Sequence, residues 1–162
     1  MLDTPDYAYT QPIEIVLPEK RKGKIFLSGT GWTNDLPLDC VNNGYTHIIN
    51  CAGKIAREQS YKTNVEQLQL NYDEIELEDI PEENLEIWAK NIYDKIDVYL
   101  ESNSKILIHC QWGKSRSVSI LIYYLMKKYK WNYNKTIDYV RKYRTIAEPN
   151  IGYETFLKSL EF

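Results

Sequence analysis

The sequence predicts an α/β fold with a central, largely parallel sheet of about five strands and helices on both faces of the sheet. One observation is that short apolar or alternating segments, typical of strands, alternate along the chain with longer segments whose apolar residues recur at helical spacing. A second is that Lys105–His109 is too apolar to lie at a surface, as a central strand of a parallel sheet requires. A length of 162 residues with 43% hydrophobic and 27% charged residues fits one domain spanning residues 1–162.

The first half of the chain contains four of the expected strands. Two prolines among mixed polar residues predict an extended arm over residues 1–12. Asp35 is positioned to cap a short helix that Gly44 ends, and a polar stretch follows Cys51. The expected elements are strands at Ile13–Leu17, Lys24–Ser28, Thr46–Cys51 and Gln67–Tyr72, with a helix at Leu36–Asn43.

The second half of the chain is expected to be mostly helical around one buried strand. Pro81 suits the first turn of a helix, and the apolar residues between Leu85 and Leu100 then recur at helical spacing. Pro149 separates the last two helices. The expected elements are the strand Lys105–His109 and helices at Pro81–Glu101, Arg116–Tyr129, Asn132–Arg144 and Ile151–Leu160.

Charge and cysteine content exclude several classes of protein. The formal net charge of −3 gives no bulk attraction to nucleic acid, and no apolar run is long enough for an integral membrane segment. The N-terminal residues lack the pattern of a secretion signal. The three cysteines, Cys40, Cys51 and Cys110, are too few and too far apart for a disulfide framework or a zinc site. We therefore expect a cytoplasmic protein with reduced thiols, no metal and no cofactor.

The segment from His109 to Ser117 joins an apolar strand to the start of a helix. Backbone N–H groups converge at such a junction, and the helix directs its positive end to the same place, so the junction is suited to bind an anion. The same environment stabilises a thiolate at Cys110. Arg116 follows six residues later, and its planar guanidinium suits two phosphate oxygens. Gly113-Lys114-Ser115 also matches the end of a Walker loop, but that motif needs glycine at the position of Ile108.

The pattern CxxxxxR in the form HCxxGxSRS resembles the protein tyrosine phosphatase superfamily, and in particular its dual-specificity branch. The resemblance implies that Cys110 is the nucleophile and that Arg116 holds the phosphate. It also implies that Ser117 helps the thiolate leave and that His109 orders the loop by hydrogen bonding. The remaining loop residues are expected to surround the phosphate, namely Gln111, Trp112, Gly113, Lys114 and Ser115.

A thiolate that displaces an alkoxide or phenoxide needs an acid to protonate the leaving oxygen. In the resembling family this acid is an Asp on a loop before a long helix, and Asp79, 31 residues before Cys110, occupies that place. The alternatives are that Asp79 only marks the entry to a helix, or that Asp73 is the acid, although Asp73 lies close to the end of a strand.

The resemblance extends from about Lys24 to Phe162 and includes two further features. Arg144 with Pro149-Asn150 resembles a late motif whose Asn supports the signature loop, although the same residues also suit a turn between helices. Cys51 is followed by Ala, as in some phosphoinositide phosphatases whose Cys at this place is a resolving thiol. The alternative is that Cys51 is a small buried hydrophobe, and Cys40 is the less suitable redox partner.

The resemblance implies metal-independent hydrolysis of phosphate monoesters through a phosphocysteine intermediate. The expected substrates are phosphotyrosine and phosphoserine or phosphothreonine in a protein partner. One alternative is a phosphatase of a phospholipid headgroup, which Lys114 favours unless it is only a solvated residue of the rim. Another is a phosphate-binding module without catalysis. Trp112 replaces the small residue usual in the family, and this Trp either packs in the core or lines the pocket.

Overall fold

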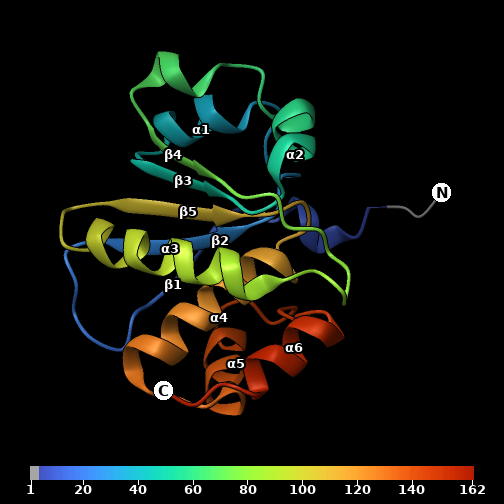
Figure 1. The fold of residues 1–162 in the computed structure, drawn as a ribbon. Helices are drawn as coiled ribbons and strands as arrows, with labels where there is room; N and C mark the ends of the chain where they lie inside the picture. Colours follow the sequence, from blue (N-terminus) through green and yellow to red (C-terminus); the bar gives the residue numbers. More distant parts are fainter. Residues whose placement is uncertain (1–3) are drawn as a thin grey trace.

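A five-stranded sheet in the order β1-β2-β5-β3-β4 crosses the computed structural model, which describes residues 4–162 (Figure 1). β1 is antiparallel to β2, and all other neighbouring strands are parallel. The strands are β1 (Ile13–Ile15), β2 (Lys24–Ser28), β3 (His47–Asn50), β4 (Asn71–Glu74) and β5 (Lys105–His109). The expected α/β fold with a largely parallel sheet is confirmed.

Helices cover both faces of the sheet. Figure 1 shows α1 (Leu36–Asn42) and α2 (Gly53–Ser60) on one side. The other side carries α3 (Leu85–Tyr99), α4 (Arg116–Tyr129), α5 (Tyr133–Arg141) and α6 (Ile151–Lys158). None of the helices in residues 4–162 is long and apolar enough to cross a membrane.

Side chains of β5 alternate between two hydrophobic cores. Ile106 and Ile108 belong to the larger core beneath α3 to α6, whereas Leu107 belongs to a smaller core beside α1. Successive strand residues point to opposite faces, so a central strand with both faces covered must be apolar throughout. This explains why β5 and the ten buried residues from Ser117 to Met126 of α4 could be placed from sequence alone.

The N-terminal arm is not extended, contrary to the expectation. Asp6–Tyr9 forms a 3₁₀ helix, and the side chain of Ala8 is buried. The backbone N–H of Gly31 donates to the carbonyl of Ala8 (3.1 Å), which ties this turn to the loop after β2. Residues 1–3 of the expected arm lie outside the described residues.

The segment between β3 and β4 also differs from the sequence prediction. The polar stretch after Cys51 contains α2, and a 3₁₀ helix at Val65–Leu68 occupies the start of the expected fourth strand. The side chain of Asn64 caps this 3₁₀ helix by accepting from Glu66 N–H (3.0 Å), so β4 begins only at Asn71. Local capping therefore outweighs the weak alternation of the expected strand.

α3 begins four residues after its predicted start at Pro81. Pro81 lies in a turn, and the helix begins at Leu85. The carbonyl of Pro81 instead packs against Gly152 of α6, where an added Cβ would lie 1.9 Å from the Pro81 oxygen. Pro81 thus holds the loop before α3 against α6, and this contact bears on the position of Asp79.

Candidate active site

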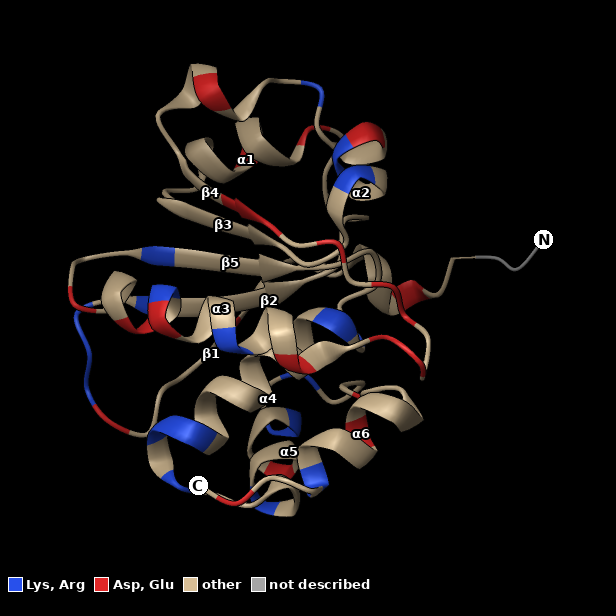
Figure 2. Cartoon of the chain, in the orientation of Figure 1, with Lys and Arg blue, Asp and Glu red and all other residues tan. Residues whose placement is uncertain are grey.

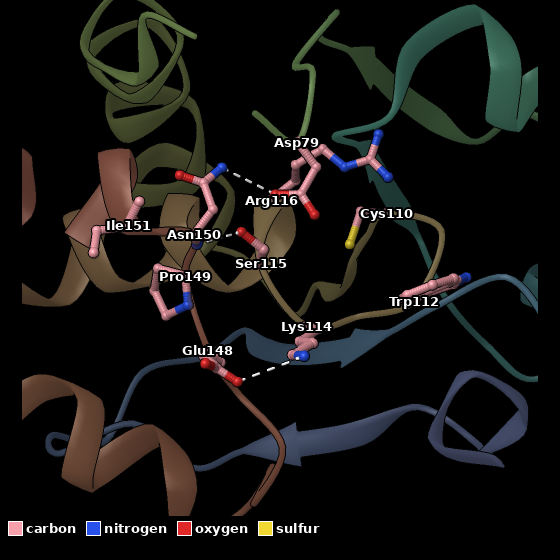
Figure 3. Close-up of a pocket in the computed structure, with 10 residues that line it drawn as sticks. All are labelled: Asp79, Cys110, Trp112, Lys114, Ser115, Arg116, Glu148, Pro149, Asn150 and Ile151. Carbon is pink, nitrogen blue, oxygen red and sulfur yellow. Dashed lines mark hydrogen bonds and ion pairs between the residues drawn. The ribbon is translucent and has the colours of Figure 1, made fainter. Parts of the chain in front are cut away.

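The loop Cys110–Ser115 joins the carboxyl end of β5 to the N-terminus of α4. Open α/β sheets place ligands at this edge, outside the carboxyl ends of the parallel strands. A cavity of about 230 Å³ opens there (Figure 3). Its lining residues are Asp79, Cys110, Trp112, Lys114, Ser115, Arg116, Glu148, Pro149, Asn150 and Ile151.

The thiol of Cys110 lies at the floor of this cavity, with 2% of the residue exposed. The backbone N–H of Gly113 donates to its Sγ atom (3.2 Å), and the Ser117 hydroxyl lies at the same distance. Burial alone would raise the pKa of the thiol, but the Arg116 charge and the donors from Ser117 and Gly113 lower it below its ordinary value. These groups favour a Cys110 thiolate.

Gly113 allows the signature loop to approach β2 closely. Its φ of 68° lies in the left-handed region, and an added Cβ would lie 2.7 Å from both Gly29 N and the carbonyl carbon of Ser28. Any side chain would therefore displace the loop and withdraw the Gly113 N–H from the Cys110 sulfur.

Arg144 fixes the outer side of the same loop. Its guanidinium, on a residue that is only 5% exposed, donates to the carbonyls of Gly113 (2.9 Å) and Trp112 (2.9 Å). It also donates to the carbonyl of Tyr7 (3.1 Å) and the hydroxyl of Thr10 (2.7 Å). The N-terminal turn and the signature loop are thereby held by one side chain.

The guanidinium of Arg116 lies beside the cavity, and its Nε has no hydrogen-bond partner among the described residues. Its Nη2 donates to Gln111 Oε1 (2.9 Å), and its Nη1 donates to the carbonyl of Leu77 (3.4 Å). The Nε atom is buried. A buried donor without an acceptor costs about 1–3 kcal/mol. An acceptor that reaches this atom would remove that cost.

His109 orders the loop from inside the protein. Its Nδ1 lies 3.1 Å from the Cys110 carbonyl, which can only accept, so Nδ1 carries the proton. Its Nε2 then accepts from the hydroxyl of Tyr61 (2.6 Å). Complete burial lowers the pKa of His109 to about 4, despite the hydrogen bond to the Cys110 carbonyl. A neutral ring with both nitrogens engaged is placed to orient the loop rather than to exchange protons with a ligand.

Asp79 faces the cavity from the loop before α3 and is held there by α6. The side chain of Asn150 donates to Asp79 Oδ1 (3.0 Å), and its backbone N–H donates to Ser115 Oγ (2.9 Å). Asn150 thus connects the acid loop to the signature loop (Figure 3). The rival Asp73 lies in β4 and accepts instead from Lys95 Nζ (2.7 Å) and the Tyr99 hydroxyl (2.7 Å).

Trp112 and Lys114 both lie at the rim. Trp112 is 40% exposed, and its ring packs edge-on against Tyr7, so the alternative that it is a core residue is wrong. Lys114 forms an ion pair with Glu148 (3.5 Å) across the edge of the cavity. The cation that favoured a phospholipid headgroup is therefore partly neutralised by a neighbour.

Cys51 lies directly beside the site. The register pairs Asn50 of β3 with His109 of β5, and the N–H of Cys51 donates to the His109 carbonyl (2.8 Å). Cys51 and Cys110 belong to the same hydrophobic core, whereas Cys40 belongs to the other. All three thiols are free.

Two residues that support the site carried no signal of this role in the sequence. Tyr61, which bonds to His109, follows a helix that the sequence did not predict. Glu148 is one of many acidic residues, and only the tertiary structure places it in the cavity. Arg144 belongs to the late motif seen in the sequence, but its contacts to the N-terminal turn depend on a segment that the sequence predicts to be extended.

Comparison with known proteins identifies the family. The family described as "Dual specificity phosphatase, catalytic domain" matches residues 33–161. A protein-tyrosine-phosphatase MKP1 from Arabidopsis thaliana is 35% identical over 129 residues, covering 80% of this chain and 16% of that protein. A dual specificity protein phosphatase 1B from the same species is 38% identical over 90 residues, covering 56% of this chain and 54% of that protein. The chain thus spans about half or less of the length of these relatives.

Solved structures agree in fold. The human tyrosine phosphatase-like serine/threonine/tyrosine-interacting protein superposes with a TM-score of 0.74 at 29% identity, covering 91% of this chain and 93% of that chain. Human DUSP28 gives a TM-score of 0.73 at 21% identity and 94% coverage of both chains, which is a likeness of fold alone. With a family match over most of its length and a signature loop at the expected place, the chain belongs to the dual-specificity phosphatase family of the protein tyrosine phosphatase superfamily.

Proposed function

We propose that the chain hydrolyses phosphate monoesters through a phosphocysteine intermediate. The observation that carries this proposal is the composition of one cavity. It brings together a thiol whose pKa is lowered, a guanidinium with a buried, unpaired Nε, and the carboxylate of Asp79. Family membership supports the same chemistry.

In the first step, the Cys110 thiolate attacks phosphorus and the bond from phosphorus to the leaving oxygen breaks. Asp79 gives its proton to that oxygen, while Arg116 and the loop N–H groups hold the equatorial oxygens of the transition state. In the second step, water attacks phosphorus, Asp79 takes a proton from it, and the sulfur leaves as a thiolate. Ser117, within 3.2 Å of the sulfur, stabilises that thiolate.

The proposed substrates are phosphotyrosine and phosphoserine or phosphothreonine in proteins. The relatives are named as protein-tyrosine and dual specificity phosphatases. The Lys114–Glu148 pair argues against the alternative of a phospholipid headgroup. We further propose that residues 1–162 act as one catalytic domain, and that the thiolate chemistry takes place in a reducing compartment such as the cytoplasm.

Phosphate release from an aryl phosphate, and from phosphotyrosine and phosphothreonine peptides of one sequence, tests this function. We expect turnover of all three, unchanged by a chelator, because the proposed steps use only side chains and water. Binding of the phosphopeptides without any release of phosphate would instead support the module without catalysis.

We also propose that Cys51 protects Cys110 from irreversible oxidation. Peroxide would convert the Cys110 thiolate to a sulfenic acid, and the Cys51 sulfur would then attack it, forming a disulfide and releasing water. Neighbouring strands are about 4.8 Å apart, within the Cα range of disulfides. Burial and the Cys110 charge raise the pKa of Cys51. Oxidation of Cys110 removes that charge and makes deprotonation of Cys51 easier.

Mild peroxide is expected to inactivate both the wild type and Cys51→Ser. Dithiothreitol should then restore the activity of the wild type but recover little of the activity of Cys51→Ser. Peptide mapping of the oxidised wild type should show a peptide linking Cys51 to Cys110. Cys40→Ser is the matched control, since Cys40 lies in the other hydrophobic core, and it should recover like the wild type. Equal recovery of Cys51→Ser and wild type would remove Cys51 from this role.

A further inference from the structure

We propose that Glu148 makes the site select phosphorylated residues that have Lys or Arg beside them in the sequence, and disfavour groups that carry a second phosphate. This inference rests on the proposed phosphatase function and names the substrate class of the same site.

Glu148 lies on the opposite side of the cavity from Asp79. Figure 3 shows Asp79 on one side of Cys110 and the Glu148–Lys114 pair on the other. The side chains of two acidic residues therefore flank the opening through which a phosphorylated side chain must reach the sulfur. Asp79 is committed to the leaving group in the proposed reaction, whereas Glu148 has no part in those steps.

The backbone of Glu148 is fixed on both sides. Its N–H donates to the carbonyl of Lys114 (2.8 Å), and two residues later the N–H of Asn150 donates to Ser115 Oγ (2.9 Å). Pro149 between them is buried and has a restricted φ. The carboxylate therefore keeps its place at the rim instead of moving with a mobile loop.

The carboxylate of Glu148 is available to a ligand. The ion pair with Lys114 spans 3.5 Å, longer than the roughly 2.7–2.9 Å of a charge-assisted hydrogen bond. The side chain of Glu148 is 64% exposed, against 37% for Lys114. A cation from a substrate can therefore approach the carboxylate oxygens without displacing a tight partner.

The balance of charge around the cavity points to the same ligand. The cavity is lined by two cations, Lys114 and Arg116, and by the Glu148 carboxylate and the Cys110 thiolate, while Asp79 carries a proton in the proposed first step. Once Arg116 holds the first phosphate, Glu148 offsets Lys114, so the negative charges of the thiolate and the bound phosphate repel a second anion and attract a cation. Apart from Arg116, Lys114 is the cationic lining residue that could hold a second phosphate, and Glu148 offsets the charge of Lys114.

The segment that leads to Asp79 and on towards α3 is itself acidic. Residues 73–83 contain seven acidic residues and no Lys or Arg, and Figure 2 shows this stretch between β4 and α3. Asp73 pairs with Lys95, and Glu74 pairs with Arg57. Within residues 4–162, the last four acids of the loop form no ion pair, namely Glu78, Asp79, Glu82 and Glu83.

The first measurement compares phosphotyrosine peptides with Lys, Ala or Glu at the position before or after the phosphorylated residue. We expect kcat/KM for at least one Lys peptide to exceed that for its Glu counterpart by about fivefold at low salt, the scale of an exposed ion pair. Glu148→Gln should reduce this ratio by about half or more, and should raise the rate on phosphoinositide vesicles relative to the Ala peptide. Glu86→Gln is the matched control, because Glu86 is an exposed partner of Lys90 (2.6 Å) on α3, and it should keep the wild-type ratio.

Binding of the same peptides to Cys110→Ser, with Glu or Gln at position 148, repeats the comparison without turnover. If the Lys peptide binds more tightly than the Glu peptide, and this difference depends on Glu148, the inference is supported. That holds even if the wild type releases no phosphate, because such a failure would contradict only the proposed catalysis. If the wild type turns over the Lys and Glu peptides with equal kcat/KM, or if Glu148→Gln leaves the ratio unchanged, the inference is overturned while the proposed phosphatase function stands. A wild-type preference for phosphoinositide vesicles over every peptide also overturns it.

Discussion

Cys110→Ser is expected to abolish turnover while phosphopeptide binding persists. A serine hydroxyl is not ionised by the groups that lower the pKa of the Cys110 thiol, so the nucleophile is lost. The loop N–H groups, held by Arg144, and the guanidinium of Arg116 remain in place to bind the phosphate. We expect kcat to fall by about four orders of magnitude or more.

Single-turnover phosphate release and peptide binding, measured on the same preparation, check this result. Cys40→Ser is the control, because it makes the same substitution at another buried thiol. Trapping by rapid acid quench should capture a phosphorylated wild-type protein and none in Cys110→Ser. Steady turnover by Cys110→Ser would assign the nucleophile to another residue.

Asp79→Asn is expected to lower kcat by about a hundredfold or more on phosphopeptides, the usual scale of general acid catalysis. An activated aryl phosphate, whose leaving group needs no proton, should lose much less. Asn cannot donate the proton but can keep a hydrogen bond to Asn150, so the loop should stay docked.

The pH profile separates the roles of Asp79 and Cys110. Activity should rise with pH as the Cys110 thiolate forms, and the lowered pKa of this thiol places that rise below the ordinary range of a cysteine. The alkaline limb, which reports loss of the proton on the acid, should flatten in Asp79→Asn. Asp73→Asn is the control, because its contacts with Lys95 and Tyr99 make its expected effect one of stability. The reverse outcome would transfer the acid role to Asp73.

The signature loop could be predicted from sequence because its determinants are local. A buried strand, a glycine that accepts a left-handed φ and a helix start lie within a few residues of each other. The placement of β5 and α4 follows from continuous apolar sequence, which only a fully covered strand or a central helix tolerates.

The elements that the sequence misplaced depend on distant partners. α2 is polar, and the Lys54 N–H in its first turn is satisfied by the side chain of Glu76, 22 residues away. Asp35 was expected to cap α1, but its carboxylate accepts from Thr63 instead. The contact between Gly152 and Pro81 likewise joins segments that no local pattern connects. Contacts of this kind form only when the chain is folded.

The position of β1 and β2 in the sheet has a consequence for any fragment of this protein. The match to the family begins at residue 33, yet β2 is the strand that pairs with one side of β5 along its whole length. A fragment starting at residue 33 would expose a row of unpaired N–H and C=O groups on the strand that leads into Cys110. Bare strand edges of this kind recruit other chains, so such a fragment would aggregate before its chemistry could be tested.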